Sequence, residues 1–290
     1  MRVSANMCSG QVVKRRVRAG PGLVRRLEVD LGLRGKSVLV LAASKGIGRA
    51  IATELAAEGA NVMISSRDES ALEATATEIR NATGAEVAYL PADVTRDEDI
   101  RALVARTVES FGGVDALVTN TGGPPPGNFE DFGDDAWLGA FESTLLNIVR
   151  AVRAVLPHMR EGGGGRIVNV ASSSIKQPIE GLTLSNTFRA GIVGLAKSLS
   201  GELGSDGVLI NTLGPGRIST DRSAGLDASN AEARGVSIEE IRREMSARIP
   251  LDRYGAPEEF AKVATFLASP ANSYVTGQSI LVDGGMVRAL

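Results

Sequence analysis

Two serines and an arginine in the middle of the chain have the types and the spacing to act on a carbonyl group. Ser172 follows a short apolar run, and Ser185 and Arg189 lie thirteen and seventeen residues further along. A helix is predicted over about 184–203, which places residues 185 and 189 on one face, one turn apart. A hydroxyl can hold a substrate oxygen by a hydrogen bond, and a guanidinium offers several donors and a permanent charge. A serine hydroxyl alone, however, is a poor source of protons at neutral pH.

A glycine-containing turn earlier in the chain predicts a site for the phosphates of a nucleotide. In L-A-A-S-K-G-I-G, residues 41–48, an apolar strand ends and a helix begins within a few residues. Gly46 and Gly48 let backbone N–H groups approach a pyrophosphate at the positive end of that helix. Such glycine pairs also occur where a chain merely turns, so the motif needs support from other parts of the chain.

The charges beside the second predicted strand favour a phosphorylated dinucleotide. A protein that uses NAD(H) places an acid at the end of this strand to bind the ribose 2'-hydroxyl. Here the strand ends at the neutral Ser66, and the next residue, Arg67, can pair with a 2'-phosphate. Lys45 adds a second positive charge on the same side. We therefore predict NADP(H) rather than NAD(H) as the cofactor.

The elements that must position these residues alternate between strand and helix. Apolar runs such as S-V-L-V-L-A, N-V-M-I-S-S and R-I-V-N-V-A predict strands, and helical periodicity covers about 68–81, 97–111 and 134–159. This alternation predicts an α/β fold: a single doubly wound, Rossmann-like parallel sheet of seven strands with helices on both faces. Residues 219–248 are polar and rich in Ala, Ser and Glu, so we expect them to form a mobile flap over the substrate pocket.

Composition sets the class of protein. A chain of 290 residues with 43% hydrophobic and 23% charged residues fits one soluble globular domain, which we place over 33–290. No apolar run approaches the roughly 18 residues that a membrane-spanning helix needs. Cys8 is the single cysteine and His158 the single histidine, which excludes a disulfide framework and predicts no metal site. We expect a cytoplasmic protein.

Positive charge is concentrated near the N-terminus. Residues 1–36 hold nine Lys and Arg against two acids, whereas the rest of the chain has 23 Lys and Arg against 32 acids. This arm lacks aromatic residues that would stack on bases, a sustained apolar face, and the apolar core of a secretion signal. We expect residues 1–32 to be a flexible leader, or translation to begin nearer Val29, and we predict neither a nucleic-acid nor a membrane partner.

Further motifs follow in an order that is typical of one family. They are A-S-K-G-I-G at 43–48, A-D-V at 92–94, N-T-G at 120–122, I-V-N-V-A-S at 167–172, P-G-R-I-S-T at 215–220, and V-T-G-Q-S-I-L-V-D-G-G near the C-terminus. With these motifs the chain, from about Leu33 to Gly285, resembles the short-chain dehydrogenase/reductase family, in particular its members similar to 3-oxoacyl-ACP reductases.

The resemblance implies a role for each motif. Asp93 and Val94 would hold the adenine, residues 120–122 would line the cofactor path, and residues 215–220 would close over the nicotinamide. The predicted cofactor-binding residues are Ala42, Ser44, Lys45, Gly46, Ile47, Gly48, Ser66, Arg67, Asp93, Val94, Asn120, Thr121, Gly122, Arg189, Pro215, Gly216, Ile218 and Thr220.

Several positions depart from the pattern of this family at its reacting centre. The family has a Tyr-x-x-x-Lys pair beginning thirteen residues after its serine, and the lysine lowers the pKa of the phenol so that it can protonate the substrate oxygen. The resemblance places Ser185 and Arg189 at these two positions and Thr144 where the family has a supporting asparagine. Ala42 replaces the first glycine of the nucleotide turn. Arginine can keep the contact of the lysine to ribose hydroxyls, but serine cannot replace the phenol.

The proton must then come from another group. Lys176 at the pocket rim is one source, although a lysine on such a loop is commonly solvated. Tyr254 or Tyr274 could turn inward, although tyrosines in such segments commonly pack. Water held between the two serines and Thr144 could relay a proton. An enone or quinone substrate, whose reduced form is a stabilised anion, would relax the need for one.

From the sequence we expect an NADP(H)-dependent oxidoreductase acting on a carbonyl or conjugated carbonyl small molecule. The candidate catalytic residues are Ser172, Ser185, Arg189 and Thr144. Two alternatives remain: a cofactor-binding pseudoenzyme or regulatory protein, and a non-redox isomerase or dehydratase on the same scaffold. The resemblance also implies a homodimer or homotetramer, paired through the helices predicted over 134–159 and 184–203.

Overall fold

The computed structural model describes residues 29–289. The predicted basic leader, residues 1–32, falls almost wholly outside the described residues and stays a prediction. Across residues 29–289, no helix combines the length and the apolarity needed to cross a lipid bilayer.

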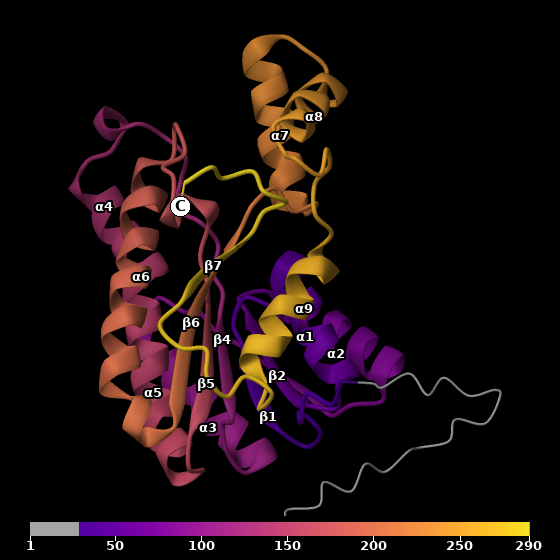
Figure 1. Cartoon of the computed structure of the whole chain (residues 1–290), viewed down its shortest axis with the longest axis vertical. Helices are drawn as coiled ribbons and strands as arrows, with labels where there is room; N and C mark the ends of the chain where they lie inside the picture. Colours follow the sequence, from indigo (N-terminus) through magenta and orange to yellow (C-terminus); the bar gives the residue numbers. More distant parts are fainter. Residues whose placement is uncertain (1–28, 290) are drawn as a thin grey trace, which may run out of the picture.

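Seven parallel strands form one sheet, in the order β3-β2-β1-β4-β5-β6-β7 (Figure 1). The strands are β1 (Ser37–Val40), β2 (Asn61–Ser66), β3 (Val87–Pro91), β4 (Ala116–Thr119), β5 (Gly165–Val170), β6 (Val208–Pro215) and β7 (Ser279–Val282). In the central β1, Leu39 pairs with Met63 of β2 and with Leu117 of β4. The direction of winding reverses between β1 and β4, and ligands of such sheets bind beyond the carboxyl ends of the strands at this point.

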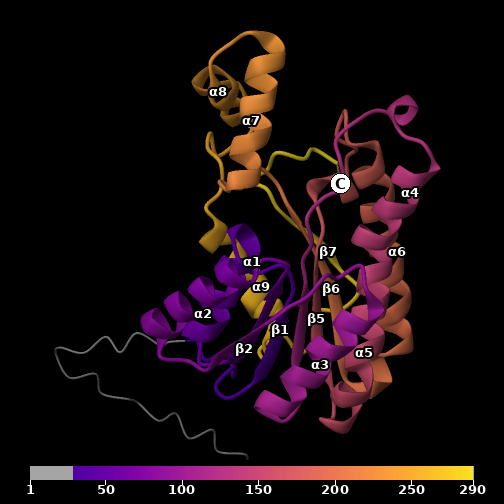
Figure 2. The same cartoon turned by 180° about the vertical axis from the view of Figure 1, so that it is seen from behind.

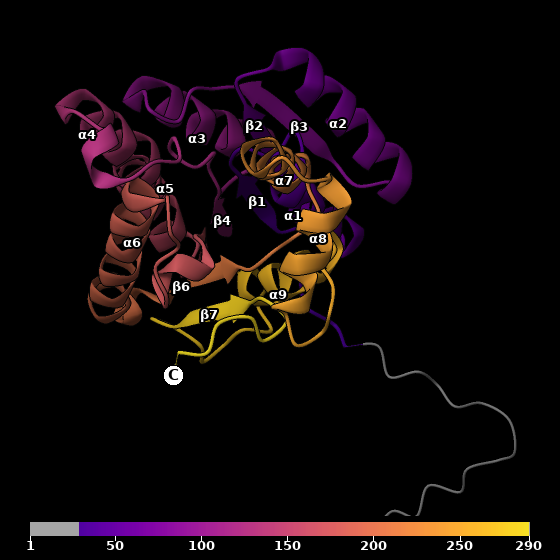
Figure 3. The same ribbon diagram turned by 90° about the horizontal axis from the view of Figure 1, so that it is seen from above.

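Helices cover both faces of the sheet, and Figure 3 shows the two groups from above. Ile51, Leu72 and Phe260 are buried where α1, α2 and α9 pack on one face. Val155 and Ile192 are buried where α5 and α6 pack, together with α3, on the other. The helices are α1 (Gly46–Ala57), α2 (Glu69–Thr83), α3 (Asp97–Phe111), α5 (Asn147–Glu161), α6 (Thr183–Glu202) and α9 (Pro257–Ala268).

Because both faces of the sheet are covered, its central strands are buried: β1 and β4 are buried at every residue. Each fully buried Leu, Ile or Val side chain stabilises the fold by about 1.5–3 kcal/mol. The predicted doubly wound parallel sheet of seven strands is confirmed.

The helix predicted over 134–159 is present and contains one π-helical turn. It divides into α4 (Asp134–Phe141), a π-helical turn η2 (Glu142–Leu146) and α5. Within this turn the carbonyl of Ser143 accepts hydrogen bonds from Thr121 Oγ1 at 2.8 Å and from Asn147 Nδ2 at 3.0 Å. The predicted long helix is therefore present, and side chains of the neighbouring loop and of α5 stabilise one wider turn within it.

Two helices stand beyond the carboxyl ends of the strands, at the top of Figure 1, and Figure 2 shows the same projection from behind. They are α7 (Asp221–Arg234) and α8 (Ile238–Ala247), which make up most of the segment predicted as a flap. Asp227 of α7 is fully buried, and its two carboxylate oxygens both accept from the Tyr254 hydroxyl at 3.1 Å. Arg217 donates to the same carboxylate at 3.4 Å. These contacts join α7 to the loops that follow β6 and precede α9.

Candidate active site

The N-terminus of α1 forms the nucleotide turn at the carboxyl end of β1. Gly46 has φ +59° and Ala42 has φ +49°, so both lie in the left-handed region that favours glycine. A Cβ at Gly48 would collide with the carbonyl oxygen of Ala42 and lie 2.8 Å from Asn120 Nδ2. Lys45, at the N-cap, makes no side-chain hydrogen bond to the helix, and the first turn contains no acid. The first-turn N–H groups therefore meet neither a capping acceptor nor a carboxylate from this turn, which suits an anionic phosphate.

Two of the predicted cofactor-binding residues brace this turn and its surroundings. Asn120 Nδ2 donates to the carbonyl of Ala42 at 3.0 Å, across the gap between β4 and β1. Thr121 Oγ1 donates to the carbonyl of Ser143 in the π turn at 2.8 Å. The loop after β4 is therefore fixed between the nucleotide turn and the start of α5.

The carboxyl end of β2 presents the charges that the sequence predicts for a 2'-phosphate. Lys45 and Arg67 are exposed, and neither forms an ion pair among residues 29–289. Asp68 caps the N-terminus of α2, because its carboxylate accepts from Ala71 N at 3.0 Å and from Ser70 Oγ at 2.8 Å. Asp93 lies just after β3, and the hydrogen bond that its carboxylate accepts from the backbone N–H of Thr95 lowers its pKa. The positive charge of Arg67 lowers this pKa further. Other predicted nucleotide-site residues are half-buried along this edge: Ser44, Ile47, Ser66 and Val94.

The carboxyl end of β5 brings the candidate catalytic residues together. Arg189, on α6, donates from Nη1 to the carbonyls of Val170 at 3.2 Å and Ala171 at 2.6 Å. Its Nε donates to Ser185 Oγ at 3.2 Å, and both side chains are only 7% exposed. Ser172 follows Ala171 directly, and its Oγ accepts from Ser174 N at 3.1 Å. One buried guanidinium therefore ties the turn before Ser172 to the face of α6 that carries Ser185.

The other groups considered as proton sources lie in different settings. Thr144 is fully buried in the π turn, and its Oγ1 has no hydrogen-bond partner among the described residues. Lys176 is exposed on its loop and Tyr274 is 96% exposed. Tyr254 donates to Asp227 at the base of α7, and burial raises the pKa of its phenol. The two tyrosines are thus not at the reacting centre.

The segment predicted to close over the nicotinamide connects β6 to α7. Gly216 packs so tightly against Asp283 that a Cβ there would lie 2.6 Å from Asp283 Cα. Ile218 is buried in the core beside Gly255, so its side chain serves packing. Thr220 caps α7 by accepting from Ser223 N. A Cβ built on Gly46 would lie 3.6 Å from Thr220 Cγ2, which brings this segment against the nucleotide turn.

Sequence reasoning missed one charged residue at this edge. Arg222, in the first turn of α7, packs its guanidinium against the backbone of Gly123, directly after the predicted N-T-G motif. Burial, and then the positive charge of Arg222, lower the pKa of Arg189 to about 10. The signal available in the sequence was the position of Arg222, two residues after Thr220 in the predicted closing segment.

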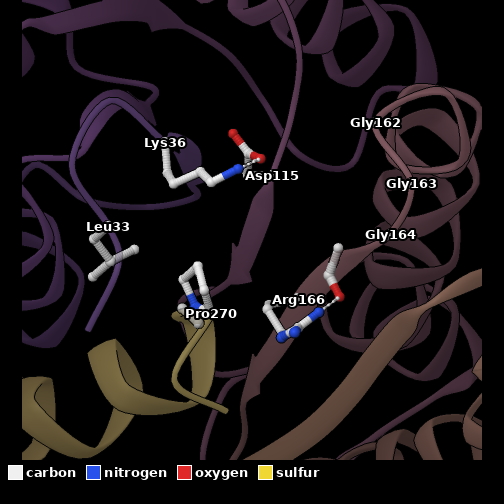
Figure 4. Close-up of a pocket in the computed structure, with 10 residues that line it drawn as sticks. Leu33, Lys36, Asp115, Gly162, Gly163, Gly164, Arg166 and Pro270 are labelled. Atoms are coloured by element: carbon white, nitrogen blue, oxygen red, sulfur yellow. Dashed lines mark hydrogen bonds and ion pairs between the residues drawn. The ribbon is translucent and has the colours of Figure 1, made fainter. Parts of the chain in front are cut away.

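A pocket of about 190 Å³ lies at the opposite, amino-terminal edge of the sheet (Figure 4). Lys36 there pairs with Asp115 at 2.8 Å, and Arg166 donates to the carbonyls of Asn272 and Gly165. These charged groups already have protein partners, and none of the predicted site residues lines the pocket. The candidate active site is therefore the carboxyl edge.

The fold and the arrangement at this edge define a protein of the Rossmann-like, doubly wound class. The family described as Enoyl-(Acyl carrier protein) reductase matches residues 41–287. The 3-oxoacyl-[acyl-carrier-protein] reductase FabG of Chlamydia muridarum is 34% identical over 251 residues, which are 87% of this chain and 97% of that relative. The chain belongs to the short-chain dehydrogenase/reductase family, a family of oxidoreductases, as its motifs predicted.

Solved structures agree with this assignment. L-sorbose reductase from Gluconobacter frateurii, in complex with NADPH and L-sorbose, matches with a TM-score of 0.87 and 30% identity, over 90% of this chain and 100% of that one. An actinorhodin polyketide ketoreductase with NADPH matches with a TM-score of 0.83 and 36% identity, over 87% of this chain and 97% of that one.

Proposed function

We propose that the protein is an NADP(H)-dependent reductase of a carbonyl or conjugated carbonyl small molecule, in which Ser185 and Arg189 together deliver the proton. The observation that carries this proposal is the buried hydrogen bond from Arg189 Nε to Ser185 Oγ, beside the end of β5. Membership of an oxidoreductase family supports the reaction class, and NADPH in the structures of two similar proteins supports the cofactor.

The residues at the carboxyl edge fit a phosphorylated dinucleotide. The first-turn N–H groups of α1 would hold the pyrophosphate, and Arg67 and Lys45 would hold the 2'-phosphate. Arg189 uses Nε and Nη1 for contacts within the protein, while its Nη2 has no acceptor among the described residues and would donate to the ribose hydroxyls. When bound, NADPH supplies the hydride.

The hydrogen-bond direction orients Ser185 as a donor. Because its Oγ accepts from Arg189, its own hydrogen is directed elsewhere, and a substrate oxygen can take it. As the carbonyl carbon gains a hydride, the Ser185 O–H bond breaks toward the substrate oxygen and the Arg189 Nε–H bond breaks toward Ser185 Oγ. The carbonyl becomes an alcohol, and the neutral Arg189 regains its proton from solvent when the product leaves.

The pKa of Arg189 suits this role. A pKa lowered to about 10 brings the guanidinium close to the ordinary value of a phenol, about 10, while leaving it charged at neutral pH. An arginine with its usual pKa would be a much weaker acid. Burial thus makes the Arg189 guanidinium a stronger acid than an exposed one, which supports a proton relay through Ser185.

Ser172 would hold the substrate oxygen. Its Oγ accepts from the backbone N–H of Ser174 and donates to no acceptor among the described residues, so its hydrogen is available to the substrate. Thr144, fully buried in the π turn, would help to hold this turn, whose Ser143 carbonyl accepts from Thr121 of the loop after β4. This assignment keeps the catalytic set predicted from the sequence and adds a direction to each hydrogen bond.

Calorimetry with NADPH and NADH, followed by single-turnover mixing with ketones, enones and quinones, tests the proposal. We expect submillimolar binding of NADPH, weaker binding of NADH, and oxidation of NADPH by at least one carbonyl class. Failure to bind NADPH would overturn the proposal. Binding without oxidation by any compound would favour a pseudoenzyme, and a product formed without cofactor turnover would favour non-redox catalysis.

We also propose that the chain forms a homodimer or homotetramer through α5 and α6. Phe129, before α4, is 69% exposed and Leu138 of α4 is 61% exposed, which places apolar surface beside these helices. Light scattering coupled to gel filtration measures the mass in solution, and a monomer at micromolar concentration would contradict this assignment.

A further inference from the structure

Arg222 reaches across the active site from α7 to the loop after β4. A Cβ at Gly123 would overlap Arg222 Nη2 and lie 2.9 Å from its Cζ. Any side chain at residue 123 would therefore displace the guanidinium. Arg222 remains exposed in this position, so its unused donors are accessible to a ligand in the site.

Arg222 contributes a positive charge that no carboxylate pairs with among residues 29–289. Arg189 is close enough for the charge of Arg222 to lower its pKa, and it is buried. Within residues 29–289, neither arginine forms an ion pair with a carboxylate. Asp227, further along α7, accepts from Tyr254 and Arg217. Two guanidinium groups held near each other repel, and an anion between or beside them removes that cost.

The position of Arg222 separates it from the groups assigned to the phosphates of the cofactor. Thr220 lies against Gly46 at the nucleotide turn, and Arg67 lies at the end of β2. Arg222 instead lies against Gly123, after β4, and near Arg189, which contacts Ser185. It is therefore on the side of the site where the proton is delivered.

We propose that the substrate carries an oxyanion, a carboxylate or a phosphate, close to its carbonyl group, and that Arg222 binds this oxyanion. Gly123 is the second specificity residue, because it leaves the space that the guanidinium occupies. Arg189 contributes its positive charge to the same region. The proposal rests on the proposed reductase function, and it narrows the substrate class to small oxo acids or phosphorylated ketones.

Binding without turnover tests the anion site separately from the reaction. Malonate and inorganic phosphate are titrated by calorimetry into the full chain without cofactor and with NADP⁺ bound, with malonamide as the neutral comparison. We expect the anions to bind, and Arg222→Gln to weaken their binding by about 10- to 100-fold, the range for hydrogen bonds between charged groups. Arg243→Gln removes one exposed charge from α8 and is the matched control.

This titration distinguishes a substrate oxyanion from a cofactor phosphate as the group that Arg222 binds. Binding that disappears when NADP⁺ is present, or an Arg222→Gln change that weakens NADP⁺ instead, would assign Arg222 to a cofactor phosphate and overturn the proposal. No anion binding, or equal binding by both variants, would also overturn it. Binding that depends on Arg222 in a protein that reduces no carbonyl would leave the anion site standing and refute the reductase function.

Kinetics then tests the substrate class. A 3-oxo acid is compared with its methyl ester, and a phosphorylated ketone with its free alcohol. We expect kcat/KM to favour the charged member of each pair by at least about tenfold, and Arg222→Gln to remove that preference while the neutral member changes little. Gly123→Ala should also remove it, because a Cβ displaces the guanidinium. An equal loss for charged and neutral members would show a structural role and refute the proposal.

Discussion

Removing the Ser185 hydroxyl tests the proton relay most directly. In the structure this oxygen is the atom through which Arg189 Nε, 3.2 Å away, would reach a substrate. Ser185→Ala leaves the guanidinium without that path, and losing a positioned general acid slows a reaction about 100- to 10,000-fold, or about 3–5 kcal/mol of barrier. The change also leaves a buried charged donor without one acceptor, which costs about 1–3 kcal/mol of stability.

The assay is single-turnover oxidation of NADPH, followed over a range of pH. In the parent protein the rate should be level at neutral pH and fall about tenfold per unit above about pH 10, because Arg189 then loses the proton that the relay uses. In Arg189→Lys the break should move to lower pH, since burial lowers the pKa of a lysine from a lower ordinary value. Ser198→Ala, at an exposed serine of the same helix, is the control.

Two results would refute the reasoning. One is a Ser185→Ala variant that reacts within about threefold of the parent, because a relay through this oxygen requires at least a 100-fold loss. The other is a parent rate that stays level beyond the pKa of Arg189. Affinity for NADPH, measured in parallel, should be unchanged by Ser185→Ala, which separates lost proton transfer from lost binding.

Three further outcomes follow from single contacts. Arg67→Ser should weaken NADPH about 10- to 100-fold and leave NADH nearly unchanged in calorimetry, because only NADPH offers a 2'-phosphate. Ala42→Gly should raise the free energy of unfolding in urea by up to about 1 kcal/mol, since Ala42 has φ +49° and strain in that region outweighs the added freedom of the unfolded chain. Asp227→Asn should increase hydrogen exchange in α7 and α8 well before global unfolding, since this buried carboxylate joins α7 to Tyr254 and Arg217; unchanged protection there would contradict it.

The sheet and the nucleotide turn could be predicted from the sequence because each depends on local patterns. Buried parallel strands require short apolar runs, and β1 and β4 are such runs. The turn around Gly46 requires glycine where φ is positive. Ala42 was recognised as a departure, and the structure gives its physical meaning: a residue with a Cβ holds the conformation of a glycine.

The π turn within the long helix, at 142–146, could not be predicted in the same way. The π turn depends on Thr121, which is distant in sequence and donates to Ser143. Two helices in the polar segment 219–248 were also missed, because only a few of their side chains, such as Ile241 and Ala231, are buried. Their apolar periodicity is too weak to distinguish short helices from a loop.

The proposed proton relay could be predicted from the sequence only in part. The spacing of Ser185 and Arg189 predicts that they share a helix face, but the direction of their hydrogen bond depends on the carbonyls of Val170 and Ala171, which fix the guanidinium. The lowered pKa of Arg189 depends on burial by several elements and on Arg222. Neither effect has a local signature, so the sequence could nominate Ser185 and Arg189 as candidates without indicating how the pair would act as an acid.

The first turn of α7 touches both halves of the site, and this has a consequence for how the site assembles. Thr220 lies against the nucleotide turn at Gly46, while Arg222 lies against Gly123. One helical turn therefore contacts both regions, and the positive charges of Arg222 and Arg189 act against each other there. An oxyanion bound by Arg222 would relieve that repulsion and stabilise the observed position of this turn. Binding energy from this remote group thereby helps to position the helix, so a neutral analogue should lose kcat as well as affinity.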